Sequence, residues 1–377
     1  MEKIQMVDLK RQYEQIQDEV DAAVLDVIKS TKYINGPEVK GFQQDLESYL
    51  GVKHVVPCAN GTDALQVAMM ALDLKPGDEV ITTSFTFVAT VEVISLLGLT
   101  PVLVDVDPDT FNIDPDAFRK AITPKTKAVV PVHLFGQSAH MEPIMDIAES
   151  HGLAVIEDNA QAIGADYLFS DGSRQKTGTI GHVGCTSFFP SKNLGCYGDG
   201  GAIFTNDDDL AKKLRVMVNH GMDVRYYHDE VGVNSRLDSI QAAILRIKLR
   251  RLDQYADARR KAAAYYDEAF GDHPGLTIPY RAAYSTHVFH QYTLKTSGID
   301  RFALQEYLMA NDVPAMIYYP VPMHLQKAYH DPRYSKGDFP VTEDLSERVI
   351  SLPMHTELDQ EQLHYITDTV LSFFKDT

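Results

Sequence analysis

The fold class follows from one stretch of the chain, which reads AVVPVHLFGQSAHMEPIMDIAESHGLAVIED over residues 128–158. It begins with the apolar run 128–132, which predicts a buried strand, and it ends with a second such run at 154–158. Between them, residues 141–151 carry apolar side chains at helical spacing. A strand, a helix and another strand of these lengths are typical of a βαβ unit with two parallel strands.

The same alternation extends to both sides of this stretch. It predicts further strands at 54–58, 79–83, 101–105, 183–188 and 201–205, and helices at 61–74, 87–97 and 115–122. We therefore expect an α/β fold whose mainly parallel central sheet is covered by helices on both faces. Two helices precede it, one at 8–30 and one whose face carries Val39, Phe42, Leu46 and Leu50.

The pattern changes in the last third of the chain. Residues 238–270 predict one long helix, which is suited to connecting two domains. We expect a large domain over 1–250, including the N-terminal helices and the start of the long helix, and a smaller α+β domain over 251–377. Within the smaller domain the sequence predicts strands at 287–294 and 315–319 and helices at 301–311 and 360–374.

Composition excludes several classes of partner. The 377 residues carry a formal net charge of −18, which should repel nucleic acids and anionic membranes. Cys58, Cys185 and Cys196 have no metal-binding spacing, so we expect no metal site and no disulfide framework. Because the chain lacks an apolar signal region and a bilayer-length apolar run, we expect a cytoplasmic location.

In open parallel sheets, ligands bind beyond the carboxyl ends of the strands, so the residues that follow each strand are the candidates. The stretch TSFFPSKNLGCYGDGG, residues 186–201, places Lys192 between a strand and a glycine-rich turn. We expect the glycines of this turn to adopt positive φ angles, as tight turns often require. A lysine held on such a turn can reach into a cleft, although a solvated loop lysine is the ordinary alternative.

Three other strand ends carry suggestive residues. Gly61 and Thr62 open a helix, where backbone N–H groups bind anions, and Ser187 offers a second hydroxyl; a plain capped helix is the alternative. Asp158 ends a strand that should be central, so its carboxylate needs a partner, either a structural cation or a cationic heterocycle nitrogen. Phe87, after a neighbouring strand, offers a ring face, although buried phenylalanines are common.

An anion cradle, an aromatic face, a carboxylate and a reactive lysine are together what pyridoxal 5′-phosphate requires. The lysine forms a Schiff base with this cofactor, and the carboxylate keeps its pyridine nitrogen protonated.

The motifs around these residues resemble the DegT/DnrJ/EryC1/StrS family of sugar-nucleotide aminotransferases, which are fold-type I pyridoxal phosphate enzymes. The resemblance covers nearly the whole chain and rests on residues 33–38, 59–65, 86–90, 131–137, 156–161, 186–201, 232–238 and 319–324.

The resemblance implies a role for each matching residue. Lys192 would bond to the cofactor and then act as acid and base. Asp158 would pair with the pyridinium nitrogen, and Gln161 would lie beside the ring hydroxyl. Phe87 would stack on the ring. The resemblance further implies a homodimer with a shared active site, in which the phosphate is bound by Gly61, Thr62, Ser187 and the partner subunit's Asn234.

The substrate rests on finer points of the resemblance. Ser235 stands where many enzymes that aminate C4 carry an aromatic residue. The lysine block resembles enzymes that aminate UDP-2-acetamido-2-deoxy-3-oxo-D-glucuronate, with L-glutamate as donor, for surface polysaccharides such as O-antigen and lipopolysaccharide. Arg236 would grip the uronate carboxylate bidentately, unless it is a structural interface arginine. Tyr318, Tyr319 and His324 would line the sugar-nucleotide side.

Other functions fit the same sequence. Within the family, the alternatives are a dTDP-3-keto-6-deoxyhexose aminotransferase and a 4-keto sugar-nucleotide aminotransferase. A non-catalytic regulatory protein with the same fold is a different class, and the retained Lys192 argues against it. Sugar dehydratases of the family usually carry a histidine in place of that lysine, and this chain does not.

Overall fold

The computed structural model describes residues 2–375. Its helices are α1 (Leu9–Glu14), α2 (Gln17–Ser30), α3 (Pro37–Leu50), α4 (Gly61–Ala71), α5 (Ala89–Leu96), α6 (Pro115–Ala121), α7 (Met141–His151), α8 (Asp208–Met217), α9 (Ser239–Leu249), α10 (Leu252–Phe270), α11 (Arg301–Ala310), α12 (Pro340–Arg348) and α13 (Gln360–Phe373). Short 3₁₀ turns lie at Leu134–Gly136, Met323–Leu325 and Lys327–Tyr329.

The strands are β1 (His54–Cys58), β2 (Glu79–Thr83), β3 (Thr100–Val104), β4 (Thr126–Val130), β5 (Ala154–Asp158), β6 (Asp166–Leu168), β7 (Arg174–Lys176), β8 (Val183–Ser187), β9 (Gly201–Thr205), β10 (Leu276–Thr277), β11 (Tyr292–Thr296) and β12 (Val349–Leu352). The largest sheet has seven strands in the order β1-β9-β8-β5-β4-β2-β3. β9 alone runs against its two neighbours, and the other pairs are parallel. The prediction of a mainly parallel sheet is therefore confirmed.

This strand order decides where ligands can gather. β5 lies fourth of seven, so the expectation that Asp158 ends a central strand is confirmed. Because β9 is antiparallel to both β1 and β8, those two strands point the same way. The carboxyl ends of β1, β8, β5, β4, β2 and β3 therefore lie along one edge of the sheet.

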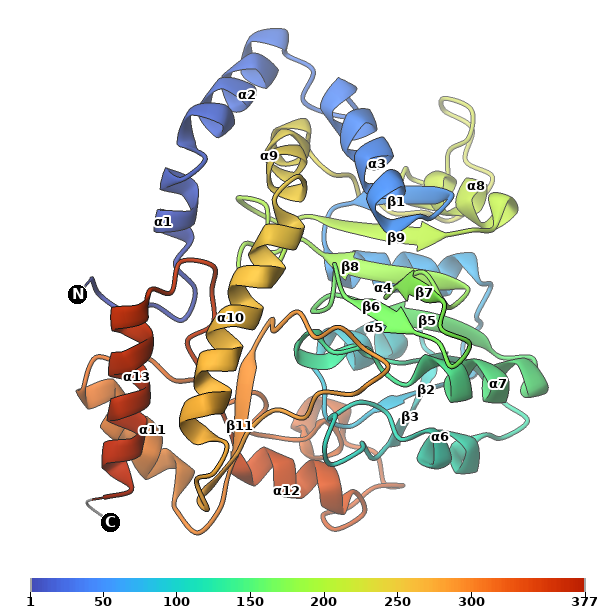
Figure 1. Ribbon diagram of the computed structural model, residues 1–377. Helices are drawn as coiled ribbons and strands as arrows, with labels where there is room; N and C mark the ends of the chain where they lie inside the picture. The colour runs from blue at the N-terminus through green and yellow to red at the C-terminus, as the bar shows by residue number, and fades with distance from the viewer. Residues whose placement is uncertain (1, 376–377) are drawn as a thin grey trace.

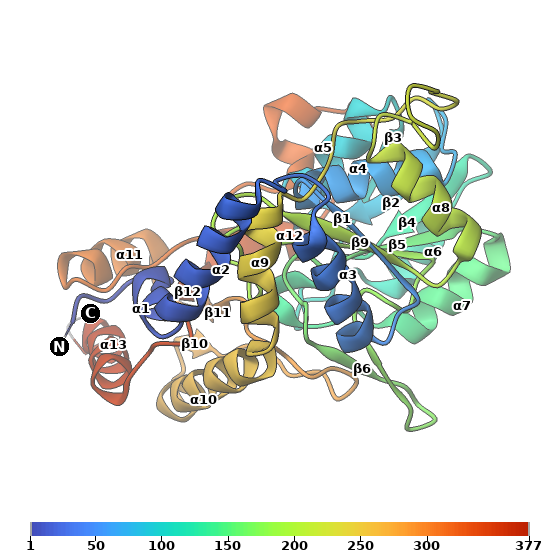
Figure 2. The same ribbon diagram turned by 90° about the horizontal axis from the view of Figure 1, so that it is seen from above.

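Helices cover both faces of this sheet, as Figure 2 shows from above. On one face α4, α5 and α8 bury residues such as Leu65, Ile94 and Leu214 against the strands. On the other face α3 and α9 pack beside α6 and α7. A parallel sheet buried on both faces needs apolar residues along nearly its whole length, which is why its strands form continuous apolar runs.

A second core lies to one side, where α10, α11 and α13 pack on the three-stranded sheet β10-β11-β12 (Figure 1). It includes Tyr266 and Phe270 of α10 together with Ile4 from the N-terminal segment. The N-terminal segment thus packs against elements of the last third of the chain. The division at residue 250 remains a prediction, although it falls between α9 and α10.

Some predicted elements were wrong. The helix expected over 238–270 is interrupted at Arg250 and Arg251, where both guanidinium groups contact Glu19 of α2. The strand expected at 287–294 begins only at Tyr292. Residues 315–319 form no strand, because only Met316 pairs with a neighbour and the two tyrosines after it turn toward a cavity.

Three further findings concern the described residues. Cys58, Cys185 and Cys196 are buried and free. Across residues 2–375, none of the helices combines the length and apolar character needed to cross a membrane. Within the same residues, no cluster of three or more His, Cys, Asp or Glu side chains is suited to hold a metal ion.

Candidate active site

A cavity of about 610 Å³ opens at the carboxyl edge of the sheet. Its walls come from residues at or after the ends of β1, β2, β4, β5 and β8 and from two later segments, which carry His290 and Gln291 and Tyr318 and Tyr319. It brings together most of the predicted site residues. The predicted residues that line it are Gly61, Thr62, Phe87, Asp158, Gln161, Ser187, Lys192, Tyr318 and Tyr319. Phe87 enters from β2, which is separated from β5 by β4 rather than adjacent to it.

Lys192 is presented by a tight turn after β8. The backbone N–H of Lys192 donates to the Phe189 carbonyl at 2.8 Å. The glycines of this turn do not adopt positive φ angles, so that prediction was wrong. They are needed for close approach instead: a Cβ on Gly195 would lie 2.3 Å from the Pro190 oxygen, and one on Gly201 would lie 2.4 Å from the Asn60 oxygen.

The environment of Lys192 favours its uncharged form. Burial lowers the pKa of Lys192 to about 8, and the negative charge of Asp158 opposes part of that decrease. A lysine with a pKa near neutrality supplies a free amine, which is the form that attacks carbonyl groups and accepts protons. The side chain is therefore suited to both roles that the sequence predicted.

Asp158 is oriented by two hydrogen bonds and is only 6% exposed. The Thr90 hydroxyl donates to its Oδ2 at 2.8 Å, and the Ala160 N–H donates to its Oδ1 at 3.2 Å. No cation of the described residues forms an ion pair with this carboxylate, so a cationic ligand is the missing partner. Sequence reasoning missed Thr90, although it ends the family motif at 86–90.

The phosphate cradle is visible in the hydrogen bonds at the start of α4. Asn60 caps this helix, because its side chain accepts from the Asp63 N–H at 2.8 Å and its carbonyl accepts from the Ala64 N–H. The N–H groups of Gly61 and Thr62 donate to no described residue, and both residues line the cavity. Two free donors at a helix N-terminus form a site for an anion.

Close packing joins this cradle to β8. A Cβ on Gly61 would lie 2.6 Å from the Cβ of Ser187, so only glycine allows the first turn of α4 to approach that strand. The Ser187 oxygen accepts from the Phe189 N–H at 3.2 Å, which leaves its hydroxyl proton free to donate. Helix donors and a hydroxyl thus meet at one end of the cavity.

Gln161 and Tyr319 form another part of the cavity wall. The Gln161 oxygen accepts from the Phe135 N–H at 2.7 Å, and its amide nitrogen donates to the Tyr319 hydroxyl at 3.0 Å. The ring of Phe87 is 53% exposed and lies 6.3 Å from that of Tyr319, measured between centroids. An exposed aromatic face inside a cavity is suited to stacking on a planar ligand.

Two predicted residues lie outside this cavity on the segment before α9. Asn234 is exposed, and Arg236 is half-buried without an ion pair to any described residue. Their segment is bound to the loop before α3, because Ser239 N–H donates to the Tyr33 carbonyl at 2.8 Å. Ser235 between them is fully buried, and its hydroxyl accepts from the Ala59 N–H at 3.0 Å.

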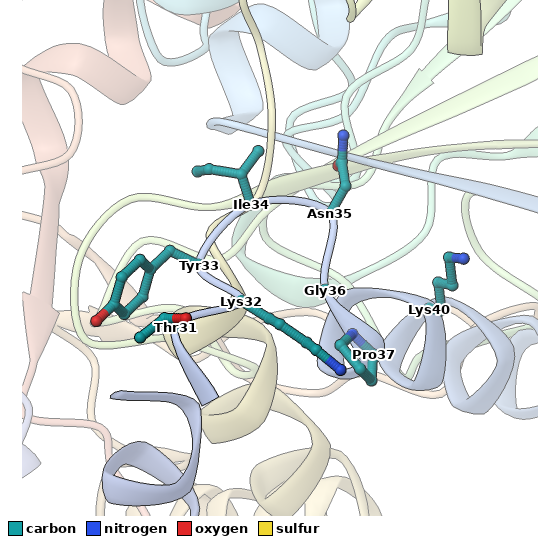
Figure 3. A pocket seen from close by; sticks show the side chains of 8 residues that line it. All are labelled: Thr31, Lys32, Tyr33, Ile34, Asn35, Gly36, Pro37 and Lys40. Atoms are coloured by element: carbon teal, nitrogen blue, oxygen red, sulfur yellow. The ribbon is translucent and has the colours of Figure 1, made fainter. Parts of the chain in front are cut away.

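That loop before α3 borders a second hollow, of about 550 Å³, lined by residues 31–37 and Lys40. Figure 3 shows Tyr33, Ile34 and Asn35 projecting from the loop in different directions, with the side chains of Lys32 and Lys40 near its other end. None of the predicted site residues lines this hollow.

His324 was predicted to line the sugar side, but it is not among the residues that line the cavity. Its Nδ1 lies 2.7 Å from the Ser84 hydroxyl and its Nε2 lies 3.0 Å from a Glu343 oxygen. Because both ring nitrogens are engaged within the fold, His324 supports the segment that carries Tyr318 and Tyr319.

The residues present fit pyridoxal phosphate. Free helix donors and a hydroxyl match its phosphate, the unpaired Asp158 matches its ring nitrogen, and Lys192 matches its aldehyde. Fold and site thus define a pyridoxal phosphate-dependent aminotransferase. More narrowly, residues 14–371 match the DegT/DnrJ/EryC1/StrS aminotransferase family, and the chain belongs to that family.

Individual relatives are similar over almost their whole length. A pleiotropic regulatory protein of Geobacillus stearothermophilus is 46% identical over 376 residues, which cover 99% of each chain. The UDP-2-acetamido-2-deoxy-3-oxo-D-glucuronate aminotransferase of Pseudomonas aeruginosa is 46% identical over 363 residues, or 96% of this chain and 98% of its own. A UDP-N-acetyl-3-dehydro-α-D-glucosamine 3-aminotransferase of Acidithiobacillus ferrooxidans is 44% identical over 97% of each chain.

Solved structures agree with this assignment. A DegT/DnrJ/EryC1/StrS aminotransferase from Brucella abortus superposes with a TM-score of 0.92 at 42% identity, over 98% of this chain and 99% of its own. NtdA from Bacillus subtilis, which was crystallised with bound cofactor PMP, gives a TM-score of 0.90 at 30% identity, over all of this chain and 86% of its own.

Proposed function

We propose that this aminotransferase transfers an amino group from L-glutamate to C3 of a UDP-linked keto-sugar, UDP-2-acetamido-2-deoxy-3-oxo-D-glucuronate. The observation that carries this proposal is the 46% identity, over nearly the full length, to a Pseudomonas aeruginosa enzyme named for that substrate. The product would enter the synthesis of surface polysaccharides, such as lipopolysaccharide O-antigen.

The described residues supply the acid–base chemistry that a transamination needs. Pyridoxal phosphate, when bound, supplies an electron sink that stabilises negative charge at the substrate carbon. The Lys192 amine, with its pKa near 8, would take the proton from that carbon and return it to the cofactor carbon on the other side of the transferred nitrogen. Asp158, held by Thr90, keeps a proton on the heterocycle nitrogen, and Gly61 and Thr62 hold the phosphate.

Arg236 supports a uronate as the acceptor. It forms no ion pair with any described residue, and a guanidinium binds carboxylates bidentately. The Acidithiobacillus ferrooxidans relative, whose named sugar has no carboxylate, is almost as similar. Arg236 is therefore the residue on which the distinction between the two substrates rests.

A homodimer would complete the site. Asn234 and Arg236 lie outside the cavity of their own chain, on a face that also exposes apolar side chains. Tyr226 is 76% exposed and Val231 is 84% exposed in the loop just before Asn234. Exposed apolar groups of this size mark contact surfaces, so we place the partner's cavity against this segment. The free buried thiols suit the reducing cytoplasm.

The substrate is tested by assaying the purified protein with glutamate and a panel of 3-keto and 4-keto UDP- and dTDP-sugars, with products identified by mass spectrometry. We expect the UDP-3-keto-uronate to be the best acceptor. Arg236→Ala should raise KM for the uronate at least tenfold and leave KM for a sugar without a carboxylate unchanged. An equal effect on both sugars would contradict the uronate assignment.

A regulatory function is the second candidate, because the Geobacillus stearothermophilus relative is named as a regulatory protein. Borohydride reduction followed by peptide mapping separates the two. An aminotransferase must carry a pyridoxyl group on Lys192, whereas an unlabelled Lys192 after incubation with pyridoxal phosphate would end the catalytic proposal.

A further inference from the structure

Gln161 and Tyr319 present two hydrogen-bond donors at one place in the cavity. The Gln161 oxygen accepts from the Phe135 N–H at 2.7 Å, which fixes the orientation of the amide and leaves both of its own N–H groups to donate. One of them donates to the Tyr319 hydroxyl at 3.0 Å. Because that hydroxyl oxygen already accepts, the Tyr319 O–H is free to donate, and no described residue accepts from it. The second N–H of the Gln161 amide likewise meets no described acceptor.

The loop that orients Gln161 is held in an unusual conformation. Phe135 has a φ of 56° and a ψ of 6°, in the left-handed region that a bulky side chain rarely adopts. Neighbouring bonds hold it there: the Leu134 N–H donates to the Asn112 side chain at 2.9 Å, and the Phe135 carbonyl accepts from the Gln291 N–H at 3.3 Å. Such strain persists where the surrounding structure imposes a particular geometry, and here that geometry presents an N–H to Gln161.

The ring of Tyr319 is fixed by aromatic neighbours. It stacks on the Phe135 ring with 6.4 Å between the centroids, and it meets the Phe85 ring edge-on at 6.0 Å. Both phenylalanines are buried, so the hydroxyl has little freedom to leave Gln161. Burial raises the pKa of Tyr319, and the nearby negative charge of Asp158 adds to this effect. The phenol therefore stays protonated near neutral pH and can donate.

The bond to Gln161 distinguishes Tyr319 from the other hydroxyl groups of the cavity. Ser191 and Tyr318 also line it, but neither is hydrogen-bonded to Gln161. Two donor groups whose nitrogen and oxygen atoms lie 3.0 Å apart can bind a single oxygen atom together, and such a pair favours an oxygen with negative charge. Pyridoxal phosphate carries one such oxygen outside its phosphate, namely the ring hydroxyl, which ionises readily when the ring nitrogen is protonated.

We propose that Tyr319 is a cofactor-binding residue whose hydroxyl donates, together with the Gln161 amide, to the ring oxygen of pyridoxal phosphate. The family resemblance gives only Gln161 to that oxygen and places Tyr319 on the sugar-nucleotide side. Tyr319 thus belongs to the cofactor rather than to the sugar nucleotide. This rests on the proposed function only in that pyridoxal phosphate is the group bound, and the identity of the sugar does not enter.

The test compares two cofactors that differ in this one oxygen. Cofactor-free protein is titrated with pyridoxal phosphate and with 3-deoxypyridoxal phosphate, which lacks the ring hydroxyl, and binding is followed by absorbance. Tyr319→Phe removes the hydroxyl and keeps the ring that stacks on Phe135. We expect this variant to bind pyridoxal phosphate about tenfold more weakly, as the loss of one hydrogen bond to a charged oxygen implies. It should bind the 3-deoxy analogue within about twofold of the wild type.

Tyr266→Phe is the matched control. Tyr266 is also buried, and its hydroxyl donates to the Pro353 carbonyl at 2.9 Å, but it does not line the cavity. This variant should bind both cofactors like the wild type.

The absorbance of the bound cofactor gives a second measurement. Its change with pH reports the protonation of the nitrogen that joins the cofactor to Lys192. Donors to the ring oxygen draw negative charge away from that nitrogen, so they make its protonation less favourable. Tyr319→Phe should therefore raise the midpoint of this titration by about one pH unit.

An equal loss of affinity for both cofactors in Tyr319→Phe would overturn the proposal, because the hydroxyl would then act only through packing. Unchanged affinity for pyridoxal phosphate would overturn it as well. Should that variant fail to fold, as judged by circular dichroism, Tyr319→Leu carries the same expectations and the same contrary results. Failure of the proposed function looks different: the protein would bind pyridoxal phosphate and yet transfer no amino group to any sugar of the panel.

Discussion

Two buried lysines, Lys192 and Lys248, show that the same residue type has different roles in different surroundings. Burial lowers the pKa of both Lys192 and Lys248 to about 8. Lys192 lines a cavity that is open to ligands. Lys248 on α9 is 1% exposed, and its amine has no hydrogen-bond partner but lies 5.3 Å from the centre of the Tyr197 ring. The same shift thus serves chemistry at one site and is a cost of packing at the other.

The Lys248→Met substitution should stabilise the protein at neutral pH. It removes a buried, unpaired charge, and the gain should be roughly 1–3 kcal/mol after the loss of the contact with Tyr197. The folded pKa lies below the unfolded one, so the penalty is complete below about pH 8. Stability of the wild type then rises as the pH increases toward about 10.5. The advantage of the variant should shrink across that window.

Urea unfolding of the wild type and of Lys248→Met, both at the same protein concentration, measures this difference in unfolding free energy. Because Lys192 is present in both, its own titration cancels. A difference in unfolding free energy that is constant from about pH 7 to about pH 10 would show that burial does not lower the pKa of Lys248.

Thr90→Val should weaken cofactor binding, because Thr90 orients Asp158. Loss of the 2.8 Å hydrogen bond removes one of the two contacts that orient the carboxylate, and a bond to a charged group contributes about 1.5–3 kcal/mol. We expect pyridoxal phosphate to bind 10- to 100-fold more weakly, at about 1.4 kcal/mol per tenfold. Thr90→Ser keeps the hydroxyl and should bind nearly as the wild type, as judged by titration of the cofactor absorbance.

At the scale of elements, the site depends on the junction between β9, β1 and α4. Gly201 begins β9 and lies against the backbone of Asn60, which caps α4. The antiparallel β9 thus returns from the lysine turn directly beside the phosphate cradle. One strand holds the lysine turn and the start of α4 in a fixed relation.

Gly201→Ala should disturb both the lysine turn and the start of α4. Its Cβ would lie 2.4 Å from a backbone oxygen that cannot move without shifting α4, so we expect a loss of about 2 kcal/mol or more in unfolding free energy and weaker cofactor binding. Gly198→Ala in the same turn is the comparison, because its Cβ would come nearest the side-chain amide of Gln241, which is hydrogen-bonded to the Tyr197 backbone, rather than a backbone atom, so we expect a smaller loss. Equal tolerance of both substitutions, measured by urea unfolding, would contradict this account.

The sheet and the positions after its strands could be predicted because each strand is a short apolar run that must be buried on both faces. The contact of Thr90 with Asp158 and the place of His290 in the cavity could not be predicted, since both depend on which distant segments meet there. The same holds for the interruption at Arg250 and Arg251, where α2 supplies the acid that binds both side chains. The local sequence pattern carries no information about such distant partners.

At the scale of the whole molecule, Arg236 lies outside the cavity of its own chain. A shared site predicts that two defective variants complement each other when activity is measured at a uronate concentration well below the KM of Arg236→Ala. Lys192→Ala and Arg236→Ala, unfolded and refolded together in equal amounts, should form mixed dimers with one intact site each. About a quarter of wild-type uronate activity should return. If the mixture is no more active than the two variants measured separately, Arg236 acts within its own chain.

The reactivity of the three buried thiols can report local unfolding of the protein. Cys58 ends β1 just before the phosphate cradle, Cys185 lies in β8 beside Asp158, and Cys196 lies in the lysine turn. A thiol reagent can reach each one only when that part of the fold transiently exposes it. Mass spectrometry of the time course would therefore report separate opening rates for three walls of the site. We expect pyridoxal phosphate to slow labelling of Cys58 and Cys196, because Gly61 and Thr62, near Cys58, and Lys192, near Cys196, would hold it.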